Sequence, residues 1–76
     1  MEIKNFIQHF AEQFDDTDIN EFTPSTVFHD LDEYSSLVAL SIIAMINEEY
    51  DVTLKGDDMS AAVTIEDLYN IVKSKI

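Results

Sequence analysis

The sequence lacks cysteine, so it can form no disulfide, no thiolate metal site and no cysteine nucleophile. Lysine is its only basic residue type, and 4 lysines stand against 16 acidic residues, which gives a formal net charge of −12. This charge repels nucleic acid backbones and anionic membranes, and it favours partner proteins with basic surfaces. No apolar run is long enough to span a bilayer. The acidic, amphipathic start is unlike a signal or transit peptide, which predicts a cytoplasmic location.

The only proline, Pro24, lies in a long connection, and the only glycine, Gly56, predicts a sharp change of chain direction. No alternation of apolar and polar residues with a period of two persists anywhere, so no strand is predicted. The hydrophobic content of 46% is too high for a disordered acidic tail. Residues 1–76 are therefore predicted to form one small monomeric domain with a modest core.

Apolar spacing and capping signals predict four helices, over residues 2–14, 36–50, 57–62 and 65–74. The last helix follows Thr64, which forms a capping signal with Asp67. The first helix places five apolar residues on one face: Ile3, Phe6, Ile7, Phe10 and Phe14. The predicted fold class is therefore all-α, a bundle of three main helices and one short helix with a long first loop.

The long connection over residues 15–34 needs anchors inside the core, because a structureless loop of this length is unusual in a compact domain. The expected anchors are its apolar residues: Ile19, Phe22, Val27, Phe28 and Leu31. The acids at its start suggest a calcium loop, but the EF-hand pattern requires glycine and glutamate where Glu21 and Val27 stand. These acids are interpreted as turn formers, and no metal site is predicted.

The helix over residues 36–50 has more apolar residues than one core face needs. At 100° per residue, one set is expected to face the core: Ala39, Leu40, Ile43, Ile46 and Tyr50. A second set points elsewhere and is predicted to be a partner-docking surface: Leu37, Val38, Ser41, Met45 and Glu48. The alternative is that the long loop or the short helix covers these apolar side chains.

Two serines stand where this helix begins. Ser35 is expected to be the N-cap, because its hydroxyl can accept a hydrogen bond from a free N–H of the first turn. Ser36 is then the first helical residue, at the helix end that favours an anion, so it is well positioned to carry a phosphate ester. Ser36 and His29 as nucleophile and base would also need an orienting group, an oxyanion site and a substrate pocket. An enzyme is therefore not predicted.

The triplet Ser35-Ser36-Leu37 resembles the Asp-Ser-Leu motif of acyl carrier proteins, in which the serine carries 4′-phosphopantetheine. Two more segments resemble the family, Phe28-His29-Asp30-Leu31 and Glu48-Glu49-Tyr50-Asp51. The second stands at the matching distance from Ser36, whereas the spacing from Leu31 to Ser36 is one residue longer than in the fatty-acid type. The resemblance covers most of the chain. It implies a non-catalytic four-helix carrier with the cofactor attached covalently to Ser36, as in fatty acid or polyketide biosynthesis. The implied partners are a phosphopantetheinyl transferase and acyl-loading and acyl-using enzymes with basic or apolar docking surfaces.

The sequence departs from the family pattern at the motif and along the following helix. Ser35 stands where the family has aspartate, which keeps the capping role but removes the charge. Positions that bear acids in fatty-acid carriers are occupied by Val38, Ser41 and Asn47. These differences predict a specialised carrier rather than the housekeeping one. The alternative function is an unmodified acidic helical module that binds a basic protein partner.

Overall fold

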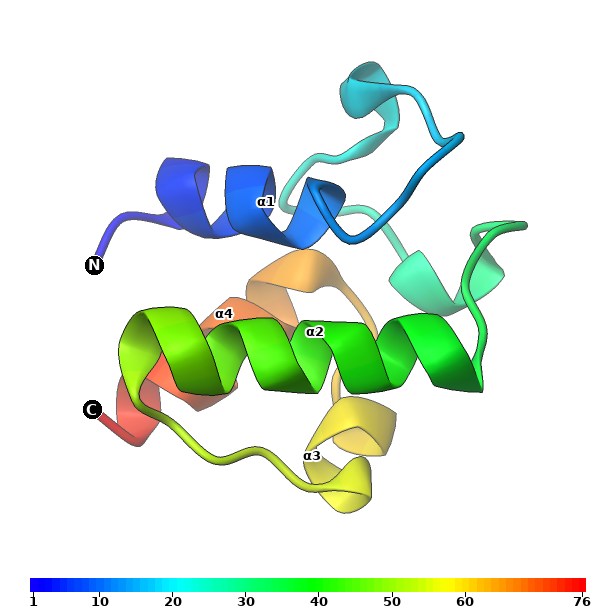
Figure 1. The fold of residues 1–76 in the computed structure, drawn as a ribbon. Coiled ribbons are helices and arrows are strands. Elements are labelled where there is room, and N and C mark those ends of the chain that lie inside the picture. Colours follow the sequence, from blue (N-terminus) through cyan, green and yellow to red (C-terminus); the bar gives the residue numbers. More distant parts are fainter.

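The computed structural model describes residues 1–76, which fold into four α-helices and two short 3-10 helices. In chain order these are α1 (Ile3–Ala11), η1 (Ile19–Glu21), η2 (Phe28–Asp30), α2 (Ser36–Tyr50), α3 (Gly56–Ala61) and α4 (Ile65–Ser74). In Figure 1, α1 and α2 run in opposite directions, α4 lies behind α2, and both chain ends lie on one side of the molecule.

The structure has no strand, only an isolated bridge between Val27 and Thr64. The predicted all-α bundle with a long first loop is confirmed. None of the helices has the length and hydrophobicity that crossing a membrane requires.

The 5 phenylalanines of the chain are all buried, and they join the long loop to the helices. The ring centroid of Phe10 lies 5.5 Å from that of Phe14 and 5.4 Å from that of Phe28 in η2. Phe6 meets Tyr69 of α4 edge to face at 5.6 Å. Aromatic pairs of this kind add about 0.5–1.5 kcal/mol each beyond the area that they bury. The rings therefore hold α1, the loop and α4 around one core.

α1 ends at Ala11 rather than at the predicted residue 14. The Gln13 N–H donates to the Phe10 carbonyl at 3.1 Å, and the Phe14 N–H donates to the Ala11 carbonyl at 3.0 Å. These bonds span three residues instead of four, so the last turn tightens out of α-helical geometry. Phe14 stays buried on the same side as Phe10. The apolar spacing thus indicated the correct face of α1 but placed its end too late.

α4 covers the predicted residues Ile65–Ser74 and begins with the predicted cap. The Thr64 hydroxyl accepts a hydrogen bond from the Asp67 N–H at 3.1 Å, and the Asp67 carboxylate accepts one from the Thr64 N–H at 3.1 Å. This reciprocal pair satisfies two of the free N–H groups at the helix start. The N–H groups of Thr64 and Val63 hold the pKa of the Asp67 carboxyl below its usual range.

The long loop is anchored by a carboxylate as well as by apolar side chains. Glu33 accepts hydrogen bonds from the Thr17 hydroxyl at 2.7 Å and from the Asp15 N–H at 2.6 Å. A third bond comes from the Asp16 N–H at 3.0 Å. The Thr17 hydroxyl and the backbone of Asp15 lower the pKa of Glu33, since they favour its ionised form. This side chain therefore ties the two ends of the loop together, a role that its sequence neighbourhood does not indicate.

Two of the predicted loop anchors are not in the core, and the prediction is wrong for Ile19 and Val27. Ile19 is 61% exposed because η1 turns Phe22, at its other end, into the core instead. Val27 is exposed because its backbone pairs with the segment before α4, which leaves its side chain at the surface. Phe22 and Phe28 are buried as predicted, and Leu31 packs against the core while partly exposed.

α2 buries a side that only partly matches the predicted one, since Ile46 is buried as predicted but Leu40 is not. Ile42, Met45 and Ile46 are buried, whereas Leu40, predicted to be in the core, is 62% exposed. The other members of the predicted face pack against the core while partly exposed: Ala39, Ile43 and Tyr50. Apolar residues surround most of α2, so its periodicity does not mark one side. The positions of the helices packed around α2 decide which side is buried.

Asp51 ends α2 in the left-handed region, at φ 56° and ψ 38°. This conformation disfavours a residue with a Cβ by about 1–2 kcal/mol, and glycine avoids that penalty but loses about 0.5–1 kcal/mol more in chain entropy. We therefore expect Asp51→Gly to increase the free energy of unfolding by about 0.5–1 kcal/mol, which should raise Tm by roughly 2–8 °C.

Thermal melts followed by circular dichroism measure this effect. Asp51→Asn is the control, because it removes the carboxylate from the negative end of the helix dipole but keeps a Cβ. If the glycine variant melts no higher than the asparagine variant, the left-handed backbone conformation at Asp51 does not destabilise the fold.

The acidic surface predicts that salt and mild acid stabilise the fold. Against a net charge of −12, the only ion pair that involves a lysine joins Lys75 and Asp58 at 3.9 Å. Raising the salt concentration from about 0.01 to 0.15 M shortens the Debye length from about 30 to 8 Å, so repulsion between carboxylates should fall and Tm at neutral pH should rise. A Tm that is unchanged or lower at the higher salt concentration contradicts this expectation.

The pH dependence has two opposing parts. Neutralising surface acids reduces repulsion, so Tm should rise as the pH falls from about 7 to 5. Glu33 and Asp67 act in the other direction, because their folded-state pKa values are lowered by hydrogen bonds. Their stabilisation is complete above the unfolded-state pKa and is lost as the pH falls through the folded-state pKa, so Tm should decrease again below about pH 4. A series of melts across this range should therefore show a maximum at mildly acidic pH.

Candidate functional site

The start of α2 gives its two serines different roles. The Ser35 hydroxyl accepts a hydrogen bond from the Val38 N–H at 3.3 Å, and its carbonyl accepts one from the Ala39 N–H at 2.8 Å. Ser36 is the first helical residue and is exposed. The predicted N-cap and the predicted first helical residue are both confirmed. Both serines are exposed, but only the Ser35 hydroxyl is engaged as the cap of the helix.

An open groove of about 350 Å³ lies beside Ser36, between α2 and α3. The residues of α2 that line it are Ser36, Ala39, Leu40 and Ile43. The residues of α3 that line it are Gly56, Met59 and Ser60. The residues that line the groove are therefore mainly apolar, and two serines are among them.

Two aromatic side chains from the end of the loop complete this groove. The His29 ring stacks on Phe28 with centroids 4.3 Å apart, and the Tyr34 ring meets His29 edge to face at 5.0 Å. Burial raises the pKa of Tyr34, so its hydroxyl stays neutral at neutral pH. The His29 Nε2 atom lies 3.0 Å from the Ala62 carbonyl oxygen and 3.2 Å from that of Met59. Sequence reasoning did not indicate this contact, because more than 30 residues separate His29 from Ala62.

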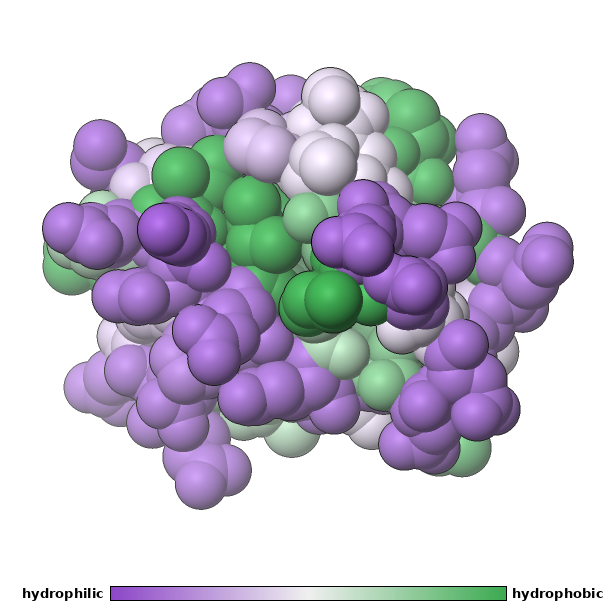
Figure 2. All heavy atoms as spheres, turned by 90° about the horizontal axis from the view of Figure 1, so that it is seen from above, coloured by the Kyte–Doolittle hydropathy of each residue, from purple (hydrophilic) through white to green (hydrophobic).

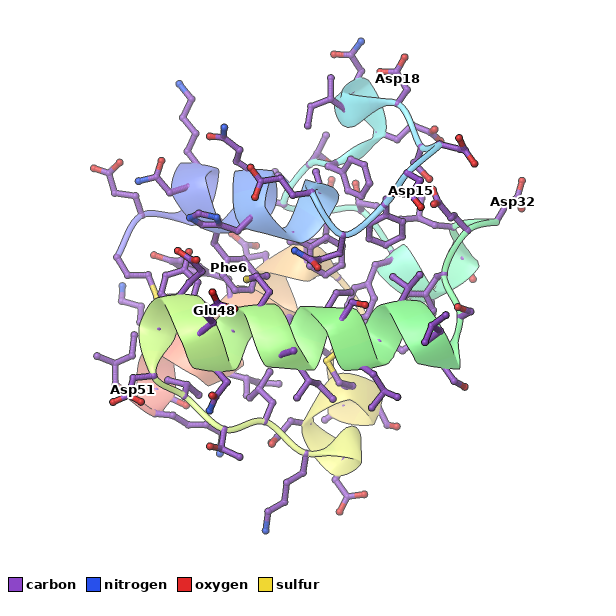
Figure 3. The ribbon with its side chains drawn as sticks, in the orientation of Figure 1. Phe6, Asp15, Asp18, Asp32, Glu48 and Asp51 are labelled. Carbon is purple, nitrogen blue, oxygen red and sulfur yellow. The ribbon has the colours of Figure 1, made fainter.

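The structure places the predicted docking residues at different depths. Leu37 is 75% exposed, and Glu48 is exposed as well. Val38 packs against the core while partly exposed, and the partly buried Ser41 donates its hydroxyl to the Leu37 carbonyl at 3.3 Å. Figure 3 shows Glu48 toward the far end of α2, away from the serines. Leu37 is therefore the only apolar member of the set that is fully at the surface.

Met45 is wrongly predicted as part of this surface. Its side chain is only 7% exposed and belongs to the core, because α2 is rotated relative to the predicted orientation. The same rotation brings Leu40 to the surface, beside the groove that Ser36 also lines. Leu40 is the exposed apolar residue near Ser36 that sequence reasoning missed.

Acidic residues of the loop surround a second hollow of about 270 Å³, lined in part by Asp16, Glu21, Asp30, Asp32 and Glu33. Figure 3 labels Asp15 and Asp18 on the first part of the loop, and it shows Asp32 at the tip of the turn that precedes α2. In Figure 2, hydrophilic side chains cover most of one face and leave a band of hydrophobic atoms exposed between them. No group of three or more His, Cys, Asp or Glu side chains converges as metal ligands would. The loop that precedes α2 thus carries several acidic side chains, whereas the first turn of α2 carries none.

A small helical bundle that presents an exposed serine at a capped helix start, beside an open groove, has the architecture of a carrier domain. Residues 5–72 match the phosphopantetheine attachment site family, and the chain belongs to this family. The prosthetic group of the family is 4′-phosphopantetheine, attached covalently to a serine, and its domains are generally carriers rather than catalysts. No curated protein matches the chain, and no solved structure does.

The residues at the start of α2 fit this prosthetic group. The first N–H groups of a helix have no acceptor within the helix, and the dipole is positive there, so a phosphate is favoured. The first turn of α2 contains no acidic residue that would repel it. The adjacent groove offers an apolar surface beside Ser36.

Proposed function

We propose that this protein is an acyl carrier protein that holds acyl intermediates as thioesters on a 4′-phosphopantetheine arm attached to Ser36. The observation that carries the proposal is the contrast between the two serines in a chain of the attachment family. The Ser35 hydroxyl is bound to the Val38 N–H, whereas Ser36 is exposed at the first position of α2. Ser36 combines an exposed hydroxyl that has no capping role with a position that stabilises a phosphate.

The protein contributes attachment and presentation. The terminal thiol of the arm supplies the chemistry by which acyl groups are carried. Ser36 would hold the phosphate ester, and the N–H groups and dipole of the first turn of α2 would stabilise its negative charge. Ser35 would keep this turn formed through its bond to Val38. None of these residues is asked to break or form a bond in the cargo.

Partner enzymes are proposed to dock beside Ser36 on a mixed surface. Its apolar part consists of Leu37 and Leu40, with Val38 and Ser41 beneath them, and Glu48 lies at its far end. Burying one such leucine contributes about 1.5–3 kcal/mol, whereas an exposed ion pair contributes about 0–1 kcal/mol. Apolar contact would thus supply most of the affinity.

The acids of the loop are proposed to complement this apolar contact. Asp30 and Asp32 lie on the loop that leads into α2. Their charges would steer partners with basic surfaces into register. A phosphopantetheinyl transferase and acyl-loading and acyl-using enzymes are the proposed partners, and the predicted cytoplasmic location and monomeric state stay predictions.

Intact-mass measurement tests the proposed function. The unmodified protein is incubated with coenzyme A and a phosphopantetheinyl transferase of broad specificity, with an established carrier protein as the positive control. We expect the mass to increase by one phosphopantetheine group. If the control is modified and this protein is not, the alternative function, an unmodified acidic module that binds a basic partner, is favoured.

A further inference from the structure

We propose that His29 is a positioning residue that ties α3 to the loop leading into Ser36, and so holds one wall of the groove beside that serine. The inference rests on the proposed function for the meaning of the groove, but the contact itself is independent of modification. His29 comes from η2, at the end of the long loop, and reaches the carboxyl end of α3.

The hydrogen-bond partners of His29 define which atom carries its proton. Both groups near Nε2 are backbone carbonyls, of Ala62 at 3.0 Å and of Met59 at 3.2 Å, and carbonyl oxygens only accept. Nε2 must therefore be the protonated nitrogen, and its single N–H is shared between the two oxygens. Carbonyls at the end of a helix have no partner within the helix, so His29 caps α3 from another part of the chain.

The ring of His29 also packs against aromatic residues of the core. Its ring stacks on Phe28, which is fully buried and packs edge to face on Phe10 at 5.4 Å. Tyr34 contacts both rings, with centroids 5.4 Å from Phe28 and 5.0 Å from His29. The imidazole thus links the carboxyl end of α3 to the aromatic part of the core around Phe28.

α3 needs such a link because it is short. It has 6 residues, and helices of this length are not stable without tertiary contacts. Met59 and Ala62 anchor it in the core, while its start is held by the Asp58 carboxylate, which accepts from the Lys55 N–H at 3.0 Å. The hydrogen bond from His29 joins α3 to the segment before Ser36. Since Met59 and Ser60 form one wall of the groove, this contact sets where that wall lies.

The test separates the donor of His29 from its ring. His29→Phe keeps an aromatic ring to stack on Phe28 but has no donor, whereas His29→Gln keeps an N–H near the position of Nε2 but has no ring. His29 is exposed, so both variants should fold. His9→Phe is the matched control, since His9 is the only other histidine and lies on α1, near Glu12 and Glu49. Amide hydrogen exchange of the unmodified proteins is measured by NMR, and the rates in α3 are compared with those in α2 and α4.

We expect His29→Phe to accelerate exchange of the Met59, Ser60 and Ala61 amides about five- to tenfold relative to α2 and α4, the effect of losing roughly one net hydrogen bond. His29→Gln should return these rates close to those of the wild type, and His9→Phe should leave them unchanged. Equal α3 protection in His29→Phe and the wild type would overturn the proposal, and so would equal loss of protection in the Phe and Gln variants.

The two proposals fail in different ways. A protein that shows this exchange pattern but gains no mass with the transferase contradicts the attachment at Ser36 and leaves the tie to α3 in place. A protein that gains mass but shows no effect of His29→Phe on α3 overturns the role of His29 alone.

Discussion

Ser36→Ala is expected to abolish the addition of phosphopantetheine, while Ser35→Ala should retain it. The alanine at position 36 removes the exposed hydroxyl of the first helical residue, whereas the Ser35 hydroxyl is the N-cap that accepts from the Val38 N–H. It should not weaken the helix, because alanine has the highest helix propensity. Intact mass after incubation with coenzyme A and the transferase should therefore show no increase for Ser36→Ala, and its Tm should match that of the wild type.

The paired variant, Ser35→Ala, should have the opposite properties. It removes the oxygen that accepts from the Val38 N–H, and loss of an N-cap costs about 1 kcal/mol, or roughly 4–8 °C in Tm for a domain of this size. Modification should still occur, since Ser36 is intact. A mass increase in Ser36→Ala, located at Ser35 by peptide sequencing, would show that the assignment of the two serines is reversed.

The parts of the fold that sequence predicted well depend on contacts between near neighbours. Ser35 bonds to Val38, and Thr64 exchanges bonds with Asp67, so the starts of α2 and α4 are determined within one turn of the chain. The residue types at such positions have strong preferences. This is why the candidate attachment residue could be located before the structure was known.

The parts that sequence did not predict depend on distant contacts. Glu33 reaches back to Asp15 and Thr17, and His29 reaches forward to Ala62, and no local pattern indicates either pair. The end of α1 belongs to the same class, because the chain leaves the helix at Ala11 to enter a loop that Glu33 holds in place. Hydrogen bonds to backbone groups far along the chain follow from the assembled fold, so they can only be seen in it.

The docking surface shows the same limit in another form. Apolar residues cover most of α2, so a turn of the helix by about one residue changes which side chains are buried. Periodicity placed Leu40 inside and Met45 outside, and the structure has them reversed. The apolar docking surface near Ser36 stays a proposal, but Leu40 replaces Met45 among the residues that form it.

Met45→Glu is expected to unfold the domain, while Leu40→Glu should leave Tm nearly unchanged. Met45 is 7% exposed, and replacing a buried methionine removes about 2–5 kcal/mol of packing before any cost of burying a carboxylate. A small domain has only about 5–15 kcal/mol of stability in total, so the variant should lack a cooperative thermal transition. Leu40 is 62% exposed, and a substitution there should change the free energy of unfolding by no more than about 0.5 kcal/mol.

The pair is matched, because each variant adds one negative charge to α2 in a chain whose net charge is already −12. A difference in Tm between them therefore reports burial rather than charge repulsion. Leu40→Glu should also slow modification of Ser36 by the transferase, since it places a carboxylate where an apolar contact is proposed and the loss of one such contact removes about 1.5–3 kcal/mol. Equal loss of stability in the two variants would contradict the exposed position of Leu40. A folded Leu40→Glu variant that is modified at the wild-type rate would show that the transferase does not contact this side of α2.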